Sequence, residues 1–149
     1  IDLTYDYDIQ MIDEAMLRFG MPMGPFRLMD EIGLDICSHV AWDICNRLKI
    51  ECAGMVLLQD YIDAGKLGRK TGEGFYDYSK KKKKKKIKTP KDVNGIITTQ
   101  LSTIMSNEAK KVMEEGVIDD PDMLDFAMIM GTGWAPFRGG PLKSIKYKL

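Results

Sequence analysis

Residues Ile12–Arg27 read IDEAMLRFGMPMGPFR, and a later stretch, Leu124–Arg138, reads LDFAMIMGTGWAPFR. With one gap opposite Phe19, the identical pairs are Asp13/Asp125, Ala15/Ala127, Met16/Met128, Gly20/Gly131, Pro25/Pro136, Phe26/Phe137 and Arg27/Arg138. Each stretch has the pattern of a helix ended by glycine, a short Gly/Pro loop, and a second helix opened by Pro-Phe-Arg. The repeat predicts two tandem copies of one helical unit, which we expect to pack around a pseudo-twofold axis.

Composition limits the class of protein. The chain has 149 residues, of which 44% are hydrophobic, enough for one ordinary domain or two small units. Lys+Arg and Asp+Glu both number 22, so no net charge attracts the chain to nucleic acid. Its apolar runs are shorter than the roughly 20 residues that cross a bilayer. We therefore expect no nucleic-acid partner and no membrane span, and the opening at Ile1 suggests a piece of a longer protein.

Hydrophobic periodicity and the positions of Gly and Pro predict an all-α fold. We expect helices at residues 8–19, 25–32, 35–49, 53–64, 90–115 and 121–130, and another from residue 136. The third helix is predicted to bury a seam of apolar residues against a neighbour. That seam is Leu34, Cys37, Ala41, Ile44 and Leu48. The inward face of the longest helix is predicted to be Ile97, Leu101, Ile104, Ala109 and Val112.

A run of seven lysines, Lys80–Lys86, separates the two copies. Such a run repels itself and stays solvated, and it contains none of the aromatic residues that stack on nucleic-acid bases. We therefore interpret residues 80–89 as a linker. The first copy then occupies residues 1–79 and lacks its own first helix, and the second, also truncated, occupies residues 90–149.

The chain has few groups that could perform catalysis. The single histidine, His39, has no Ser, Cys or carboxylate at a spacing that indicates a relay, and surface or packed histidine is the simpler interpretation. Gly131-Thr132-Gly133 lacks the third glycine and the preceding strand of a dinucleotide loop. The carboxylates of residues 119–122 are expected to cap a helix. We predict no catalytic, cofactor-binding or metal-binding residue in this chain.

Three cysteines, Cys37, Cys45 and Cys52, form no CxxC pair. An odd number leaves one thiol unpaired under any pairing, and free thiols suit a reducing compartment. We expect three buried free thiols that act as small hydrophobic side chains.

Two pairs of segments resemble a known family. GMPMGPFRLMDEIGLD (Gly20–Asp35) followed by LGRKTGEGFYDY (Leu67–Tyr78) closely resembles the C-terminal domain of 3-hydroxyacyl-CoA dehydrogenases. MSNEAKKVMEEGVIDDP (Met105–Pro121) and GTGWAPFRGGPL (Gly131–Leu142) resemble a second copy of that domain. Tandem copies occur in multifunctional β-oxidation enzymes that fuse an enoyl-CoA hydratase to the dehydrogenase. The resemblance implies a helical fold like the C-terminal domain of 6-phosphogluconate dehydrogenase.

The resemblance also implies an activity for the parent protein, the NAD-dependent oxidation of (S)-3-hydroxyacyl-CoA to 3-ketoacyl-CoA. In the family an upstream Rossmann domain binds NAD and carries a His–Glu pair, in which one residue is the general base and the other orients it, so we expect this chain to be inactive alone. Family members also use an Asn on the first helix of the first copy to help position the substrate carbonyl. In the second copy Thr99 falls at that position, and we transfer no catalytic role to it.

The resemblance implies one substrate-facing segment in this chain. In family members the loop and helix start after PMGP lie near the cleft where the acyl group enters. Met23, Gly24, Pro25 and Phe26 are therefore our candidates for lining substrate, and the alternative is that this loop only joins two helices. Because Arg27 and Arg138 recur at one point of the repeat, we expect a symmetric structural role, such as a hydrogen bond to a neighbouring helix end.

Two other interpretations stay open. One is a stand-alone helical interaction or dimerisation module. The other is a related β-hydroxyacid or 6-phosphogluconate-type dehydrogenase, against which the GMPMGPF and KTGEGFYDY segments argue. The expected compartment of the parent enzyme is a bacterial cytoplasm, with the mitochondrial matrix as the alternative.

Overall fold

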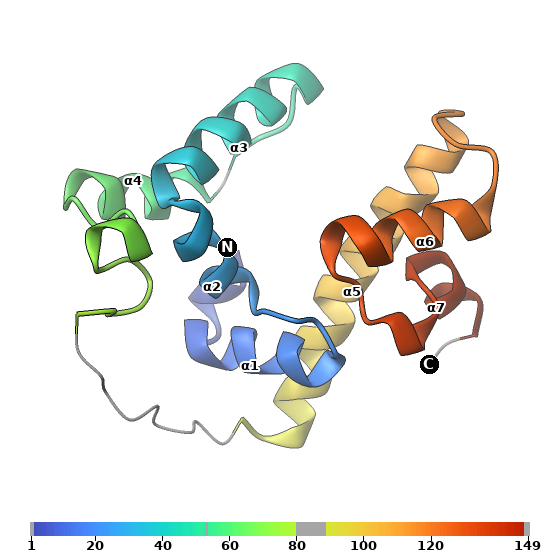
Figure 1. Ribbon diagram of the computed structural model, residues 1–149, viewed down its shortest axis with the longest axis horizontal. Coiled ribbons are helices and arrows are strands. Elements are labelled where there is room, and N and C mark those ends of the chain that lie inside the picture. Colours follow the sequence, from blue (N-terminus) through green and yellow to red (C-terminus); the bar gives the residue numbers. More distant parts are fainter. Residues whose placement is uncertain (1, 53, 80–88, 148–149) are drawn as a thin grey trace. The chain divides into compact units, whose positions relative to one another are not determined.

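The structure, a computed structural model, describes residues 2–52, 54–79 and 89–147, in which helices are joined by loops and turns (Figure 1). The elements are η1 (Asp2–Tyr5), α1 (Ile9–Phe19), α2 (Pro25–Ile32), α3 (Leu34–Leu48), α4 (Met55–Asp63), η2 (Arg69–Thr71), α5 (Lys91–Glu114), α6 (Pro121–Thr132), η3 (Pro136–Arg138) and α7 (Pro141–Tyr147). Within these ranges there is no β-strand, only isolated bridges among Gly68, Glu73 and Asp77. The predicted all-α class is confirmed. None of the described helices is long and apolar enough to cross a membrane.

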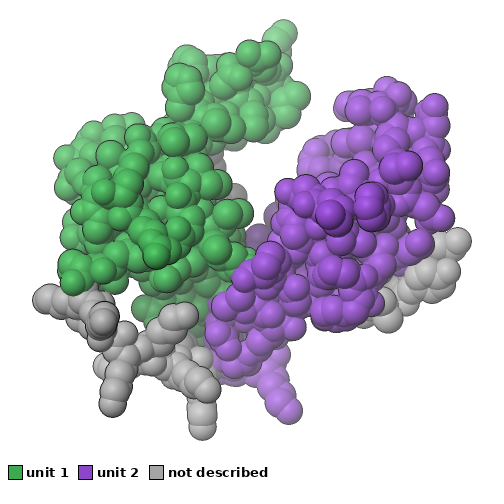
Figure 2. Space-filling model, in the orientation of Figure 1, with its two compact units in different colours: residues 1–13, 23–88 green, residues 14–22, 89–149 purple. Residues whose placement is uncertain are grey.

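The chain forms two compact units, coloured green and purple in Figure 2. Unit 1 contains residues 1–13 and 23–88, and unit 2 contains residues 14–22 and 89–149. The boundary falls within α1, so this helix contributes its first turn to unit 1 and the rest to unit 2. The predicted pseudo-twofold axis and the division at residues 79 and 90 stay predictions. The lysine run, predicted to be a linker, lies outside the described residues.

Gly, Pro and Asp set the helix boundaries. Gly20 and Gly33, both with positive φ, follow the ends of α1 and α2, and Pro25 opens α2. The side chain of Asp120 accepts hydrogen bonds from the N–H groups of residues 122 and 123, which confirms the predicted cap on α6. For six helices, the predicted first and last residues lie within two residues of those observed. The agreement is close because Gly and Pro begin or end helices through the sterics of their own backbone.

The core of unit 1 lies under the segment that follows α4. Phe75 packs between two rings, 4.9 Å from the Phe26 centroid and 4.7 Å from the Tyr61 centroid. Leu34 and Leu58 are completely or almost completely buried. Aromatic residues of the Leu67–Tyr78 segment therefore pack this loop onto the helices.

The core of unit 2 is built around Trp134, whose side chain is fully buried. Its ring meets that of Phe19 edge to face, with centroids 5.2 Å apart. Met16 and Ala135 are buried beside them, and partly buried apolar residues surround this cluster: Met21, Leu101, Met105 and Ile129. The second half of α1 and the loop after α6 therefore form this core together.

The predicted apolar seam of α3 is buried only at its start. Leu34 is fully buried, whereas Ile44 and Leu48 are 47% and 63% exposed. On α5, Ile97 and Ala109 are buried as predicted, but Ile104 is 59% exposed. The predictions for Ile44, Leu48 and Ile104 are wrong because periodicity identifies an apolar face without showing how much of it a neighbour covers.

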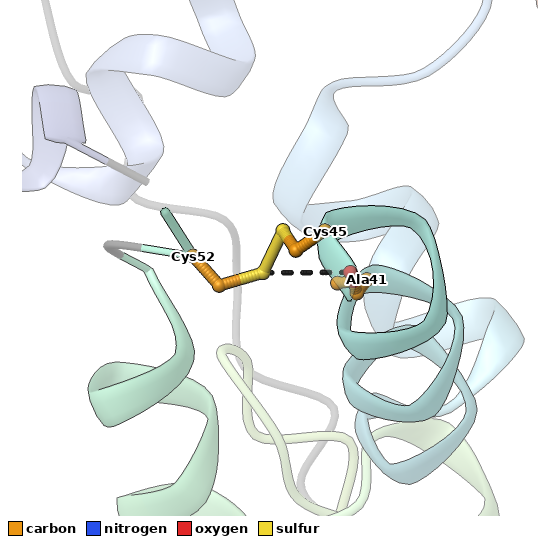
Figure 3. Close-up of a disulfide and its surroundings, with 3 residues drawn as sticks. All are labelled: Ala41, Cys45 and Cys52. Carbon is orange, nitrogen blue, oxygen red and sulfur yellow. Dashed lines mark hydrogen bonds between the residues drawn. A yellow bond between two sulfur atoms is a disulfide. The ribbon is translucent and has the colours of Figure 1, made fainter. Parts of the chain in front are cut away.

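The cysteines differ from the sequence expectation. Cys45 and Cys52 form a disulfide that links the last turn of α3 to the segment before α4 (Figure 3), with their Cα atoms 6.0 Å apart. The backbone reverses at Lys49, which has a left-handed φ of 54°, and this reversal brings the two residues together. Among the described residues, Cys37 is the free thiol. The prediction of three free thiols is therefore wrong for the pair, whose proximity depends on the reversal after α3.

Candidate functional site

The segment predicted to face substrate is positioned by a buried carboxylate. Asp13, on α1, is 5% exposed and accepts hydrogen bonds from the backbone N–H groups of Phe26 (2.9 Å) and Arg27 (3.0 Å). The first N–H groups of a helix have no partner within the helix, and a negative charge there is also favoured by the helix dipole. Gly24, at the N-cap of α2, has no side chain to supply this cap. Asp13 therefore caps α2 from a neighbouring helix.

The same contact explains why residue 24 is glycine. A Cβ atom at Gly24 would overlap the Asp13 carboxylate, so any larger residue would push the cap away. Of the four predicted site residues, Gly24 is buried and Phe26 is 2% exposed, whereas Met23 and Pro25 are partly exposed. The structure thus brings all four together at the start of α2, and Met23 and Pro25 are the two accessible to a ligand.

A second buried carboxylate, Asp30, positions the Leu67–Tyr78 segment. Its oxygens accept hydrogen bonds from the N–H groups of Phe75 and Tyr76 and from the Tyr78 hydroxyl, each at 2.9 Å. Asp30 is 1% exposed, and Gly74 lies so close that a Cβ atom there would overlap it. The GEGFYDY motif is therefore a loop shaped to surround one carboxylate.

The two carboxylates and their tyrosines form a connected cluster. Tyr76 donates its hydroxyl proton to Asp13 at 2.7 Å, and the Arg27 guanidinium lies 5.4 Å and 4.8 Å from the ring centroids of Tyr76 and Tyr78. Burial, opposed by these hydrogen bonds, raises the pKa of Asp13. Burial and then hydrogen bonding to the carboxylates raise the pKa values of both tyrosines. The tyrosines therefore remain protonated donors, and the cluster is suited to structure rather than proton transfer.

Unit 2 contains the same device. Asp125, on α6, is 1% exposed and accepts hydrogen bonds from the N–H groups of Leu142 (2.8 Å) and Lys143 (3.1 Å) at the start of α7. A Cβ atom at Gly140 would overlap the Asp125 carboxylate, as at Gly24. Residues 24–27 (Gly-Pro-Phe-Arg) therefore correspond in structure to residues 140–143 (Gly-Pro-Leu-Lys).

This correspondence corrects the sequence alignment beyond the first helix of the repeat. The identical residues pair Pro136-Phe137-Arg138 with Pro25-Phe26-Arg27, but residues 136–138 form the short η3, and the next helix begins at Pro141. Residues 136–138 form an additional turn before Gly140. The residues that are identical in the sequence alignment therefore do not occupy equivalent positions in the two units. A helix does begin at Pro136 as predicted, but it is a 3-10 helix that ends at Arg138, and the α-helix equivalent to α2 begins at Pro141.

Arg27 and Arg138 accordingly differ in role. The Arg138 Nε atom donates a hydrogen bond to the Phe19 carbonyl at 2.8 Å, and its guanidinium lies 4.1 Å from the Phe19 ring centroid. The predicted bond to a helix end is confirmed for Arg138. Arg27 instead lies over the two tyrosine rings, so the prediction of a symmetric role is wrong.

Asp13, Asp30 and Asp125 were not recognised as site-building residues from the sequence. The available signal was the identity of Asp13 and Asp125 within the repeat, together with a charged residue placed beside the apolar face of α1. Asp30 gave no comparable signal, because its partners lie 45 to 48 residues away.

The other sequence candidates do not meet at a reactive centre. His39 is exposed on α3, and Thr99 is exposed on α5. The Gly131–Gly133 stretch lies at the C-terminal end of α6, where carbonyl groups disfavour a phosphate. Within the part of the chain that the structure describes, no three His, Cys, Asp or Glu residues are grouped to bind a metal.

The fold is that of a helical domain in which buried carboxylates hold helix starts and one long loop in place. Residues 3–78, just over half of the chain, match the family described as 3-hydroxyacyl-CoA dehydrogenase, C-terminal domain. The chain belongs to this family.

Two relatives extend the similarity across most of the chain. Fatty acid oxidation complex subunit alpha of Acinetobacter baylyi is 35% identical over an alignment covering 93% of the chain and 22% of the relative. The same subunit of Vibrio campbellii is 36% identical, covering 89% and 20%. The chain therefore spans about a fifth of the length of these relatives.

A solved structure supports the fold. The crystal structure of 3-hydroxybutyryl-CoA dehydrogenase from Escherichia coli K12 superposes with a TM-score of 0.68 at 19% identity. The superposition covers 95% of this chain and 48% of that chain, so the similarity includes residues of both units.

Proposed function

We propose that the chain is the helical C-terminal part of an NAD-dependent 3-hydroxyacyl-CoA dehydrogenase of fatty-acid β-oxidation. The parent protein oxidises (S)-3-hydroxyacyl-CoA to 3-ketoacyl-CoA, and this part alone is inactive. The observation that carries the proposal is the family match over residues 3–78, joined to alignments with fatty acid oxidation subunits over about nine-tenths of the chain.

NAD binding is assigned to a domain outside this chain. The described residues contain no unit of strand, glycine turn and helix of the kind that binds a dinucleotide, and Gly131–Gly133 lies at the C-terminal end of α6 instead of a helix N-terminus. These residues therefore do not fit NAD, and the redox step is assigned to residues of the parent protein outside this chain. The proposed partners in the parent protein are an upstream NAD-binding domain and a fused enoyl-CoA hydratase.

The contribution of this chain is a wall of the acyl cleft. Met23 and Pro25 are partly exposed and apolar, as lining an acyl chain requires. Gly24 and Phe26 act behind them, because Asp13 bonds the helix start and Phe75 packs on the Phe26 ring. The four residues thus form one rigid segment, in which two side chains contact substrate and two fix its position.

The duplication supplies a second contribution. Two related helical units can bury apolar surface against each other, so the tandem arrangement replaces a second subunit with an internal copy. The interpretation is supported by the same arrangement in both units, in which an aspartate carboxylate binds the start of a helix that opens with Gly-Pro, at α2 and at α7. An experimental structure that superposes unit 1 on unit 2 by a rotation near 180° would agree with it, and a pure translation would contradict it.

We place the parent enzyme in a bacterial cytoplasm, with the mitochondrial matrix as the alternative; the similar proteins described above come from bacteria. The disulfide is unusual for a reducing compartment. The Cys52 sulfur also lies 3.4 Å from the Ala41 carbonyl oxygen (Figure 3), so in a reduced protein its thiol can donate a hydrogen bond there. The local geometry therefore suits the dithiol as well.

The test uses the full-length gene product and this chain alone, assayed for NADH formation from 3-hydroxyacyl-CoA substrates of increasing acyl length. We expect activity only in the full-length protein. Met23→Ala should raise KM several-fold for long acyl chains and leave short-chain turnover unchanged. Met11→Ala, which replaces a partly buried methionine on α1, is the matched control.

The outcomes separate the two parts of the proposal. Absence of NADH formation by the full-length protein would contradict the proposed activity. Full activity with an unchanged KM in Met23→Ala would leave the activity in place and overturn the assignment of residues 23–26 to the acyl cleft.

A further inference from the structure

The disulfide of unit 1 closes a connection between two helices. Cys45 lies in the last turn of α3 and Cys52 lies just before α4. Residues 49–51 between them are exposed, and Gly54 gives α4 no side-chain cap. The turn is also held by a backbone hydrogen bond from the Ile50 N–H to the Cys45 carbonyl at 3.0 Å. The disulfide therefore closes a connection that few other bonds of the described residues secure.

The same geometry accommodates the reduced pair. The Cys52 sulfur lies 3.4 Å from the Ala41 carbonyl oxygen, so a thiol at this position has an acceptor in place (Figure 3). Lys49 ends α3 in a left-handed conformation, which is a common way for a helix to end and requires no disulfide. Both cysteines are only partly buried, as exchange with a small thiol requires. Oxidation and reduction therefore do not require the backbone to refold.

The helix that the disulfide restrains belongs to the packing behind the start of α2. α4 packs against α3 and carries Tyr61, whose ring centroid lies 4.7 Å from that of Phe75. Phe75 in turn packs on Phe26 with centroids 4.9 Å apart, and the Phe26 N–H is bonded to Asp13. A change in how firmly α4 is held therefore reaches the start of α2 through two ring contacts.

We propose that Cys45 and Cys52 are a reversible thiol–disulfide switch that sets how firmly α4 supports the start of α2. The oxidant is a small disulfide of the glutathione class. One cysteine thiolate attacks a sulfur of that disulfide, forms a mixed disulfide and releases one small thiolate; the second cysteine thiolate attacks the mixed disulfide, forms the Cys45–Cys52 bond and releases the other. Two electrons pass to the small disulfide, and the released thiolates take up the two protons that the cysteines lost.

The consequence for substrate rests on the proposed function. When the disulfide is formed, α4 is restrained and residues 23–26 are supported from behind by the stacked rings. When it is reduced, this support weakens. Long acyl chains, which make the most contacts with such a wall, should then bind less tightly.

The first experiment equilibrates the 149-residue chain with mixtures of reduced and oxidised glutathione, traps free thiols by alkylation and counts them by mass. We expect one two-electron transition, with the dithiol predominant in a large excess of reduced glutathione, and the same transition in Cys37→Ser. A disulfide that persists under that excess would be purely structural, and absence of the disulfide at every ratio would leave only a dithiol. Either result would overturn the proposal.

The second experiment compares hydrogen exchange in the oxidised and reduced chain. Reduction should speed exchange in α4 by about tenfold or more, and at the N–H groups of Phe26 and Arg27 by about two- to fivefold. Exchange in α7, which belongs to unit 2, should not change. Faster exchange in α4 alone would overturn the coupling to α2.

Two tyrosine variants test the route of the coupling. Tyr61→Leu removes the ring between α4 and Phe75 and keeps an apolar side chain, so Phe26 and Arg27 should no longer respond to reduction although α4 does. Tyr5→Leu, the same change at an exposed tyrosine, should leave both responses in place. A full response at Phe26 in Tyr61→Leu would overturn the route through the rings.

The full-length protein tests the consequence for substrate. Reduction should raise KM for long acyl substrates several-fold, and the Cys45→Ser/Cys52→Ser variant should have that raised KM with or without dithiothreitol. An equal KM in both redox states of an active enzyme would overturn the link to the acyl cleft. Absence of any NADH formation would instead contradict the proposed function, and the thiol and exchange measurements on the 149-residue chain would still decide the switch.

Discussion

Asp13 in unit 1 and Asp125 in unit 2 begin from the same arrangement and differ in what surrounds it. Each carboxylate is almost completely buried and accepts two N–H groups at the start of the helix that follows a Gly-Pro pair. Asp13 also accepts the Tyr76 hydroxyl, and Asp30 adds a second carboxylate beside it. The comparison shows that the two-bond cap is the shared element, and that the tyrosine cluster is particular to unit 1.

Unit 2 has its own addition. The carboxylate and the first helix N–H that it binds are 13 residues apart in unit 1 and 17 residues apart in unit 2. The longer segment includes Trp134, the centre of the unit 2 core, and Arg138, which binds the end of α1. Thus unit 1 adds tyrosine hydrogen bonds to the carboxylates, whereas unit 2 has a longer loop between the carboxylate and the helix that it caps.

The largest effect is expected from removing the carboxylates. Asp30→Ala leaves two partly buried N–H groups and a hydroxyl without their acceptor and should destabilise unit 1 by about 4 kcal/mol. Asp125→Ala leaves two N–H groups without an acceptor and should lower the free energy of unfolding of unit 2 by about 3 kcal/mol. Hydrogen exchange of residues 75–78 and of α7 measures both. Asp60→Ala, at an exposed site, is the control, and a larger cost for Asp125→Ala would contradict the ranking.

A somewhat smaller effect is expected at the glycines beside the carboxylates. Gly140→Ala should destabilise unit 2 by about 2 to 3 kcal/mol, because φ is +108° there and the new methyl displaces Asp125. Gly24→Ala should cost about 2 kcal/mol, since only the contact with Asp13 is lost. Urea denaturation measures both variants. Gly95→Ala, at an open site in α5, should instead stabilise unit 2 by about 0.5 to 1 kcal/mol.

The disulfide should stabilise unit 1 alone. It closes a loop between residues seven apart, for which chain entropy gives about 2 kcal/mol. Dithiothreitol should therefore lower the melting temperature of unit 1, followed through signals of α3 and α4. The hydrogen-exchange rates of unit 2 amides should not change. The Cys45→Ser/Cys52→Ser variant should no longer respond to dithiothreitol, and Cys37→Ser should respond like the parent chain. Three titratable thiols before any reduction would show that the dithiol form predominates.

The smallest effect in this series is an alkaline one. The pKa values of Tyr76 and Tyr78 are raised in the folded protein, so their contribution to stability is complete below the unfolded pKa of about 10 and decreases as the pH rises above it. Unit 1 should therefore lose stability above about pH 10, and the Tyr76→Phe/Tyr78→Phe variant should lose less. Denaturant midpoints at several pH values provide the measurement. An equal loss in the variant would assign the effect to other groups.

The sequence predicted the features that depend on neighbours along the chain. Gly20 and Gly33 end helices and Pro25 and Pro121 open them, because each acts through its own backbone sterics. The helix start in the second copy is less regular, since Pro136 opens only a short turn and Pro141 opens the helix. Proline is compatible with both places, and only the Asp125 contact distinguishes them.

Features that depend on distant partners were missed. Asp30 is surrounded by a loop more than 40 residues away, and Cys45 meets Cys52 because the chain reverses at Lys49. The proposed substrate-lining residues were found through family resemblance, but the sequence did not show that Gly24 and Phe26 are buried while Met23 and Pro25 remain accessible.

A carboxylate that binds two consecutive N–H groups requires only that the helix begins at the right position in space. The number of residues in the loop before that helix can vary. After a gene segment is duplicated, insertions between the Asp and its Gly-Pro partner can accumulate without loss of the anchor. The loop of unit 2 is four residues longer by this measure, from 13 to 17, and includes a tryptophan and an arginine with new contacts. In this domain the loop ahead of a capped helix is therefore the natural place for evolution, or a protein engineer, to introduce a new binding function.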